Sequence, residues 1–427
     1  MKSDRKPVDA AQAVAALEAW FATVTSDAGV TGPALGIRAN CLGWCGPAHD
    51  WRLEGLIEGR ILRHQATGDP THLDFLEITL RHLIAAQLGD GSFRNSYFEY
   101  NPFEGGMPHE PAVLASALRA RTVLASANRA VPGLAEAVTR ALDGRHLRLL
   151  WNKTLHTVRD WEISDYQFGP SISAAAVLDL ILEWTAWQGE WERYQERASQ
   201  LAAWIRGLQE TSGSMAGGIH TSNRRGGGIS PFYSARCLGP LHRYAQRTGC
   251  TETKTSITNL VAFLHRQQLP EGGFRRLLWN WRPASANPLH LGTSAAILHA
   301  LHPFQSLSAE DLARQQAWLL SHATPSGAFR AALGHGRLHH GSGTGTSDWR
   351  DWMPSPGWQD KIYLFFCQLA PASKERFDPQ PWSTPTTVRH ASGFYTETPD
   401  DITVQRGRDT VYHWKKKTQV PDLCRLT

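Results

Sequence analysis

The sequence predicts an all-α protein, a closed (α/α)6 toroid of about twelve alternating inner and outer helices. Three observations carry this prediction. A helical hairpin over 51–93 recurs about 180 positions later, where Gln268 and Phe274 stand in place of Gln87 and Phe93. Helix starts preceded by Pro or Gly recur about every 60 residues. A helical hairpin cannot bury its apolar face alone, so repeated hairpins must stack on one another.

The helices expected in chain order follow from apolar residues at helical spacing. The helices that enter the ring are expected to start near residues 51, 110, 171, 231, 291 and 356, and the returning helices cover 11–26, 71–87, 132–147 and segments ending near 209, 268 and 322. In strict alternation they make six inner and six outer helices, with the two terminal helices completing the last pair. In the third hairpin, Met215 is expected at the place that Phe93 holds in the first.

The helical pattern stops near Pro371, and a short β-rich C-terminal appendage is expected after it. The segments 393–396, 401–404 and 410–414 alternate like short strands, with a turn at 406–409. The expected organisation is therefore a toroid over residues 1–370 and a tail with short strands over 371–427.

The composition and net charge limit the kinds of ligand and partner that the protein is expected to bind. The net charge of +5 over 427 residues is mild and dispersed, so it permits an anionic ligand and does not support nucleic-acid binding. The amino terminus lacks the apolar core of a signal peptide, and no apolar run is long enough for a membrane span. Six scattered cysteines favour reduced thiols in a cytoplasmic protein. The expected partner is a small-molecule or oligosaccharide substrate, with no cofactor and with the oligomeric state left open.

The segments 87–93 and 268–274 resemble the QxxxDGxW-type repeat of the terpenoid-cyclase and protein-prenyltransferase α/α-toroid superfamily. The sixfold alternation is similar to that of the six-hairpin glycosidases and related polysaccharide lyases. The resemblance covers about residues 11–370 and implies the fold only, because a Gln, a Gly turn and an aromatic side chain are structural chemistry. The DxDD motif of class II cyclases and the Cys-His-Gly signature of lanthionine cyclases are absent.

In such a ring the loops that enter the inner helices converge on one mouth, and here those loops are both polar and aromatic. Indole rings stack on sugar faces while polar side chains bind the sugar edges, so the loops favour recognition of a hydroxylated ligand. The candidate substrate-binding residues are Trp44, His49, Trp51, His109, Glu110, Glu162, Tyr166, Asn223, Arg225, Trp281, Arg282, His290, Trp349 and Trp352.

Two reactions fit this mouth. Glycosidic hydrolysis needs two carboxylates across it, for which Asp50, Asp165 and Asp351 are the candidates. Elimination from a uronate needs a Tyr or His base, and His220 and Tyr233 lie close in sequence to Asn223 and Arg225, which would neutralise the carboxylate. Each carboxylate also has a structural alternative, because Asp is favoured at helix N-caps.

No metal site is expected, since the His-rich segment 335–341 has no Cys or Glu partner at ligand spacing and Cys41 and Cys45 fit buried thiols. The leading hypothesis is a cytoplasmic carbohydrate-active enzyme, a glycoside hydrolase or polysaccharide-lyase-like enzyme that acts on an oligosaccharide or glycoconjugate. The alternatives are a terpenoid-cyclase-like enzyme on an isoprenoid and a non-catalytic ring that binds a glycan or a protein. Charged residues on the inner helices, such as Arg119 and Arg236, count against the cyclase.

Overall fold

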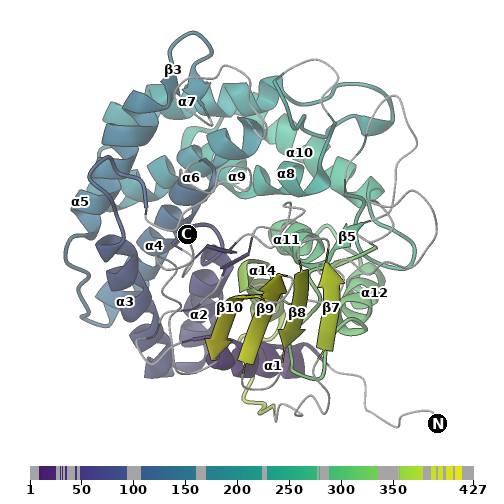
Figure 1. Ribbon diagram of the computed structural model, residues 1–427. Coiled ribbons are helices and arrows are strands. Elements are labelled where there is room, and N and C mark those ends of the chain that lie inside the picture. The colour runs from purple at the N-terminus through teal and green to yellow at the C-terminus, as the bar shows by residue number, and fades with distance from the viewer. Residues whose placement is uncertain are drawn as a thin grey trace.

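Helices arranged in a ring make up most of the described chain (Figure 1). The computed structural model describes residues 9–25, 29, 31, 34–35, 44–45, 49–93, 107–159, 170–223, 228–276, 278, 288–334, 354, 356–377, 386–390, 393–397, 401–406 and 409–415. None of the helices within these ranges is long and apolar enough to cross a membrane.

The inner layer follows the predicted helix starts closely. Its members are α2 (Glu54–Thr67), α4 (His109–Ser126), α6 (Pro170–Gln188), α8 (Pro231–Arg236) continued by α9 (Leu238–Thr248), α11 (Leu291–Leu301) and α14 (Pro356–Leu369). Each inner helix packs against the next one in this order, and α14 packs against α2. The sequence of contacts therefore returns to its start, and the closed (α/α)6 toroid is confirmed.

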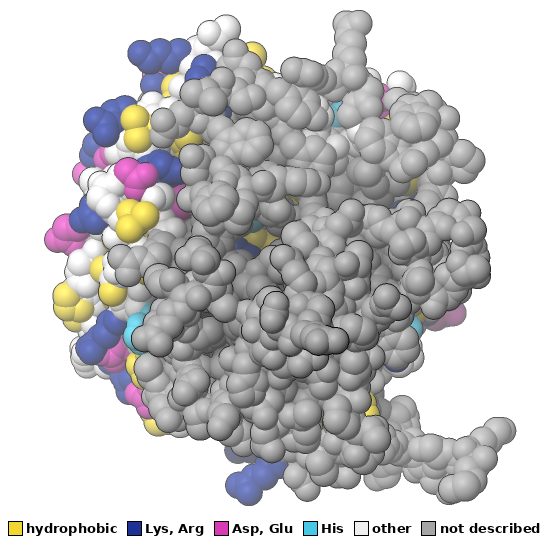
Figure 2. All heavy atoms as spheres, in the orientation of Figure 1, with side chains coloured by type: hydrophobic (Ala, Val, Ile, Leu, Met, Phe, Trp, Pro, Cys, Tyr) yellow, Lys and Arg dark blue, Asp and Glu magenta, His cyan; other side chains and the backbone are white. Residues whose placement is uncertain are grey.

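The outer layer alternates with the inner one along the chain. Its members are α1 (Ala10–Thr23), α3 (Pro70–Ala85), α5 (Leu134–Thr139) continued by the π-helix η1 (Arg140–Leu149), α7 (Trp191–Gly207), α10 (Thr251–Arg266) and α12 (Ala309–Leu320). The change to a π-helix after Thr139 was not expected from the apolar spacing. Over α3, α5 and η1 the visible surface mixes basic, acidic and apolar side chains, as a solvated outer layer does (Figure 2).

The first and last helices close the ring, as predicted. Glu18 on α1 accepts hydrogen bonds from Arg60 and Arg63 of α2, both at 3.2 Å, and from the hydroxyl of Tyr363 on α14 at 2.7 Å. A Cβ at Gly59 would lie 2.4 Å from the Tyr363 ring, so the absence of a side chain there lets α2 and α14 approach closely. The Glu18 side chain of α1 thus contacts both α2 and α14, the two inner helices between which the ring closes.

The repeated glutamine at the end of an outer helix is a structural staple. The Gln209 amide donates to Gly217 O at 2.9 Å and to Ser256 O, on the next outer helix, at 3.0 Å. The Gln87 amide likewise donates to Ala137 O on the following outer helix at 2.8 Å. This geometry confirms that the motif concerns the fold.

The bridges that close these turns correct one alignment. Gln87 pairs with Phe93 and Gln268 with Phe274, as the repeat predicts, but Gln209 pairs with Ile219. The prediction that Met215 takes the place of Phe93 is therefore wrong. The third turn is longer, because the short helix η2 (Gly213–Met215) is inserted within it.

Short strands complete the described structure. The two-residue pairs are β1 (Ala34–Leu35) with β2 (Trp44–Cys45), β3 (Trp151–Asn152) with β4 (Thr157–Val158), and β5 (Leu289–His290) with β6 (Ala332–Leu333). Near the carboxyl terminus β7 (Thr386–His390), β8 (Gly393–Glu397), β9 (Asp401–Arg406) and β10 (Asp409–Lys415) form one antiparallel sheet (Figure 1). Strands therefore occur at the three predicted segments, with β7 in addition, while the domain boundary near 370 stays a prediction.

One buried histidine makes the stability of this fold depend on pH. His146 in η1 is fully buried, and neither of its ring nitrogens has a hydrogen-bond partner among the described residues. Burial, with a smaller contribution from the charge of Arg145, lowers the pKa of His146 to about 3. In the unfolded chain the ring protonates near its ordinary pKa of about 6.5. The unfolded state therefore binds one extra proton between these values, and stability falls as the pH drops through that window.

We expect His146→Leu to reduce this sensitivity to acid. The substitution removes two unpaired polar atoms and a proton that only the unfolded state binds, so the loss of stability between pH 6.5 and 4 should shrink by about 3 kcal/mol. Denaturant unfolding at a series of pH values measures this slope. The half-exposed His302→Leu serves as the control, and an acid slope that is equal in both variants would contradict the assignment to His146.

Candidate functional site

A pocket lies where the amino-terminal ends of all six inner helices meet, and we call it the mouth pocket. The described residues that line it are Trp51, Pro108, His109, Ile172, Ser230, Phe232, Tyr233, Arg236, Arg275, Arg276, His290, Thr293, Ile297 and Trp358. They come from the turn before α2, from the amino-terminal parts of α4, α6, α11 and α14, from α8, and from the segment after the fourth repeat turn. The expected convergence of the loops on one mouth is therefore present.

Aromatic rings form a continuous cluster in this pocket. The ring centroids of Trp51 and Trp358 are 5.1 Å apart in an edge-to-face contact, and Phe232 lies 6.4 Å from the first and 5.8 Å from the second. An imidazole stands at each end, because His109 is 5.5 Å from Trp51 and His290 is 5.8 Å from Trp358. The pocket thus presents flat apolar faces flanked by two groups that can transfer protons.

Hydrogen bonds hold the backbone at several of these positions. The Lys361 ammonium donates to Trp51 O at 2.9 Å and lies 4.9 Å from the centre of the Trp51 ring. Ser230 caps α8 by accepting the amide of Tyr233. His290 belongs to β5 and pairs with Ala332 of β6. Trp51, Tyr233 and His290 are therefore held by hydrogen bonds of the backbone around them.

The polar character of the mouth pocket is cationic. Arg236, Arg275 and Arg276 line it together with the two histidines, and no carboxylate is among its described lining residues. Arg236 already pairs with Glu54 at 2.9 Å. Arg275 and Arg276 add positive charge beside the aromatic cluster, and this environment favours an anionic group on the ligand.

Asp50 lies behind the mouth pocket and not in its lining. Its side chain is fully buried and forms an ion pair with Arg52, whose Nε donates to Asp50 Oδ1 at 2.9 Å. Burial alone would raise the pKa of Asp50, but the charge of Arg52, its hydrogen bonds and His109 lower it below the ordinary value. Asp50 Oδ2 is also 4.0 Å from His109 Nδ1. This carboxylate therefore acts on His109 through its charge across 4.0 Å, and it has no direct exposure to the pocket.

Of the other described candidates, some line the mouth pocket and some do not. Tyr233, Trp51, His109 and His290 line the mouth pocket. His220 pairs with Glu210 at 3.3 Å, and neither it nor Asn223 is among the described lining residues.

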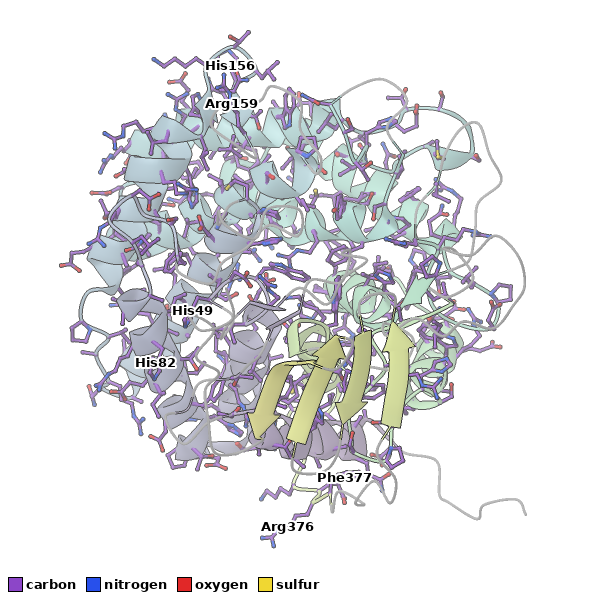
Figure 3. All side chains as sticks on the ribbon, in the orientation of Figure 1. His49, His82, His156, Arg159, Arg376 and Phe377 are labelled. Atoms are coloured by element: carbon purple, nitrogen blue, oxygen red, sulfur yellow. The ribbon has the colours of Figure 1, made fainter. Side chains whose placement is uncertain are left out.

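Glu110 and His49 stand outside the described lining as well. Glu110 is fully buried, where it accepts the Phe93 amide at 3.1 Å and faces Arg145. Burial raises its pKa to about 7, against the effect of Arg145. His49 is buried, and it lies nearer the ring centre than His82 does in the view of Figure 3.

The remaining candidates are Asp165, Asp351, Glu162, Tyr166, Arg225, Trp281, Arg282, Trp349 and Trp352, which lie outside the described residues. So does the segment 335–341, while only the backbone of Trp44 is described, in β2. Their roles stay predictions.

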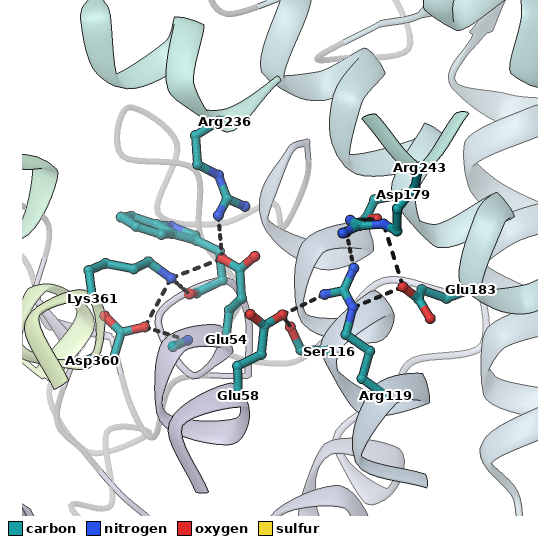
Figure 4. Close-up of polar contacts among 12 residues, drawn as sticks. Glu54, Glu58, Ser116, Arg119, Asp179, Glu183, Arg236, Arg243, Asp360 and Lys361 are labelled. Carbon is teal, nitrogen blue, oxygen red and sulfur yellow. Dashed lines mark hydrogen bonds and ion pairs between the residues drawn. The ribbon is translucent and has the colours of Figure 1, made fainter. Parts of the chain in front are cut away.

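A second cavity of about 390 Å³ continues from the mouth pocket into the centre of the ring, and we call it the central cavity. The two cavities share Ile172 and Arg236 in their walls. Its charged lining residues are Glu54, Glu58, Arg119, Asp179, Arg236, Arg243 and Lys361, many of which form ion pairs across the ring (Figure 4).

The charges at the boundary between the two cavities hold one another in place. Glu54 Oε2 lies 2.9 Å from both Arg236 Nη1 and Lys361 Nζ. Burial would raise the pKa of Glu54, but these two cations lower it to about 2. Asp360, which Lys361 also contacts at 2.9 Å, has a pKa raised by burial to about 7. Glu54 therefore stays ionised between two cations at neutral pH.

Several residues of this site were not among the sequence candidates. Arg236, Arg275, Arg276 and Phe232 line the mouth pocket but were not assigned to the site. The signal that could have found one of them is helical spacing, since Ser230, Tyr233 and Arg236 follow one another at intervals of three along α8.

Comparisons with known proteins place the fold and nothing finer. No family model and no curated protein matches the chain. Among solved structures, an unsaturated glucuronyl hydrolase specific for heparin aligns with a TM-score of 0.58 at 11% identity, over 86% of this chain and 97% of that one. The cellobiose 2-epimerase of Bacillus thermoamylovorans B4167 gives 0.58 at 11%, over 84% and 99%.

A third solved structure is an inactive variant of the α-1,6-mannanase GH76A of Salegentibacter sp. HEL1_6 in complex with α-1,6-mannotriose. It aligns with a TM-score of 0.55 at 11% identity, over 84% of this chain and 98% of that one. The chain therefore has the α/α-toroid fold of six-hairpin glycosidase-like enzymes, and identity this low says nothing about the reaction.

Proposed function

We propose that this protein is a carbohydrate-active enzyme that cleaves an oligosaccharide containing an acidic sugar, by elimination at the mouth pocket. The observation that carries the proposal is the composition of the described lining. Two histidines, a tyrosine and three arginines surround an aromatic cluster, with no carboxylate among them. This set matches the needs of elimination next to a carboxylate better than those of hydrolysis, which uses a pair of acids.

Binding of an acidic sugar follows from the chemistry of the walls. The faces of Trp51 and Trp358 suit the apolar face of a pyranose ring. The guanidinium groups of Arg275 and Arg276 can hold its carboxylate and spread the charge that develops when the neighbouring carbon loses a proton. One protein of similar fold is named as an unsaturated glucuronyl hydrolase specific for heparin, and an acidic sugar as ligand is in keeping with that name.

The reaction can be written without a further reactant. His109, with the charge of Asp50 behind it, removes the proton on C5, next to the carboxylate. A double bond forms between C4 and C5 while the bond from C4 to the glycosidic oxygen breaks. Tyr233 donates a proton to that departing oxygen, and the proton taken by His109 returns to Tyr233 through solvent after release. The products are a 4,5-unsaturated uronate and a fragment with a new hydroxyl group.

Incubation with uronate oligosaccharides tests this proposal, because the two possible reactions leave different products. Elimination should produce an ultraviolet absorbance from the new double bond conjugated with the carboxylate, and Tyr233→Phe should lower its rate by about 10² or more. Glycosidic cleavage without that absorbance would overturn elimination and favour hydrolysis, for which Asp165 and Asp351 are the acids to replace. Turnover of neutral oligosaccharides alone would overturn the acidic substrate.

The rival functions are weaker on the same observations. An isoprenoid cyclase needs an apolar tunnel, whereas the central cavity is lined by seven charged residues. A ring that only binds its ligand has no need for two imidazoles beside a stacking surface. A cytoplasmic location is part of the proposal, supported by the free thiols of the three cysteines whose side chains the structure describes.

A further inference from the structure

The mouth pocket and the central cavity follow one another along the same helices. On α11, Thr293 and Ile297 line the first, and Ala296 and Ala300 line the second, at helical intervals. Helices α4, α6 and the pair α8 and α9 also contribute to both cavities. A ligand at the mouth is therefore in line with a second compartment along the ring axis.

Small side chains keep the ring centre open. Ala112, Ala176, Ala235, Gly239, Ala296 and Ala300 face the central cavity from four consecutive inner positions. Larger apolar residues at these positions would fill it, as they fill the interior of most domains. A volume of about 390 Å³ lies within the range of ligand pockets, which starts near 300 Å³.

The two compartments differ in charge. In the central cavity every lining cation contacts a carboxylate: Arg236 and Lys361 contact Glu54, while Arg119 and Arg243 contact Asp179. An incoming anion would have to displace a carboxylate that is already in place. Sugar hydroxyls fit better, because they donate to carboxylate oxygens and accept from guanidinium groups at the same time. The mouth pocket shares Arg236 with this cavity and adds Arg275 and Arg276, with no carboxylate in its described lining.

We propose that the central cavity is a second sugar-binding compartment, which takes a neutral sugar unit joined to the acidic unit at the mouth. The inference rests on the proposed function, since it assumes a carbohydrate at the mouth. It adds which sugar unit of the ligand lies in which compartment. The ligand is then a mixed chain in which an acidic sugar is followed by a neutral one. The contact between Arg236 and Glu54 stands where the chain passes from one compartment to the other.

Filling the central cavity tests this inference, and Gly239 offers a clean way to do it. A Cβ at Gly239 would meet only the end of the flexible Arg243 side chain, at 3.5 Å or more, so Gly239→Leu should extend into open space. Replacing a helical glycine also favours the helix, and the variant should fold. Gly144→Leu on the outer helix, where a Cβ meets nothing within 4 Å, is the matched control.

The first probe is the methyl glycoside of a hexuronic acid. The other two are disaccharides in which a neutral hexose is joined to this acid, at C1 of the acid in one and at C4 of the acid in the other. Calorimetric titrations in the His109→Gln background prevent consumption of the ligands. We expect one disaccharide to bind more tightly than the methyl uronide, and Gly239→Leu to remove this gain, on the order of tenfold or more, without changing binding of the methyl uronide. Gly144→Leu should change neither.

Any other result contradicts the second compartment, its preference for a neutral sugar, or the proposed function. If the methyl uronide binds but no disaccharide binds more tightly, or the gain survives in Gly239→Leu, the second compartment is refuted and the proposed function stands. If a diuronate gains as much as the uronyl-hexose and loses that gain in Gly239→Leu, the compartment exists but its preference for a neutral unit is refuted. If no uronide binds, the proposed function fails, and the inference fails with it.

Discussion

His109→Gln should lower kcat for cleavage of a uronate oligosaccharide by about 10² to 10⁴, the range expected when a general base is removed. The glutamine keeps the side chain polar and of similar length but cannot take up a proton at neutral pH. Because binding of the carboxylate is assigned to arginines, KM should change little. The pH profile of kcat should also lose the limb that reports the base, which a purely structural role would leave in place.

His290→Gln is the matched comparison, since both imidazoles are buried at opposite ends of the same aromatic cluster. His109 has the carboxylate of Asp50 at 4.0 Å behind it. Asp50→Asn should therefore shift the pH profile in the same direction as loss of His109, with a smaller fall in kcat. If His290→Gln abolishes turnover while His109→Gln leaves it intact, the assignment of the base is wrong.

The fold could be predicted from the sequence because its signals are local and repeated. Pro231 and Pro356 mark helix starts within one residue of their observed places, and the staple of Gln87 and Phe93 recurs with Gln268 and Phe274. The exceptions are also local: an inserted turn moves the partner of Gln209, and the π-helix after Thr139 has no apolar signature of its own.

The site was less predictable, because it depends on which side chains face the ring axis. Asp50 has the residue type of a catalyst, but the neighbouring Arg52 turns it into a buried ion pair behind His109. Arg275 and Arg276 follow a structural turn and were assigned no role, although the ring brings them to the mouth. The central cavity left no local signal at all, since its charges come from helices that are far apart in the sequence.

Loss of Arg119 should have the largest effect on stability. Its guanidinium contacts Glu58, Asp179 and Glu183, which come from two other inner helices, α2 and α6 (Figure 4). Burial would raise the pKa of Asp179, but Arg119 and Arg243 lower it to about 2, so the carboxylate is charged at neutral pH. Arg119→Leu leaves three acidic groups close together, of which Asp179 and Glu183 keep Arg243 as a partner. We expect a loss of about 3 kcal/mol at pH 7, at the lower end for a broken buried pair because the cavity admits water.

The pH dependence of that loss separates electrostatics from packing. Without Arg119 the carboxylates are destabilised in the folded state, so their folded pKa values rise, and protonation on acidification then relieves the repulsion. The difference in unfolding free energy between the variant and the wild type should therefore shrink from pH 7 to pH 4.5. Arg129→Leu, which removes an exposed ion pair with Asp74 on the outer surface, should cost much less at both pH values. A loss in Arg119→Leu that does not change with pH would mean that the side chain acts through packing alone, and that the ion pairs across the central cavity do not hold the ring together.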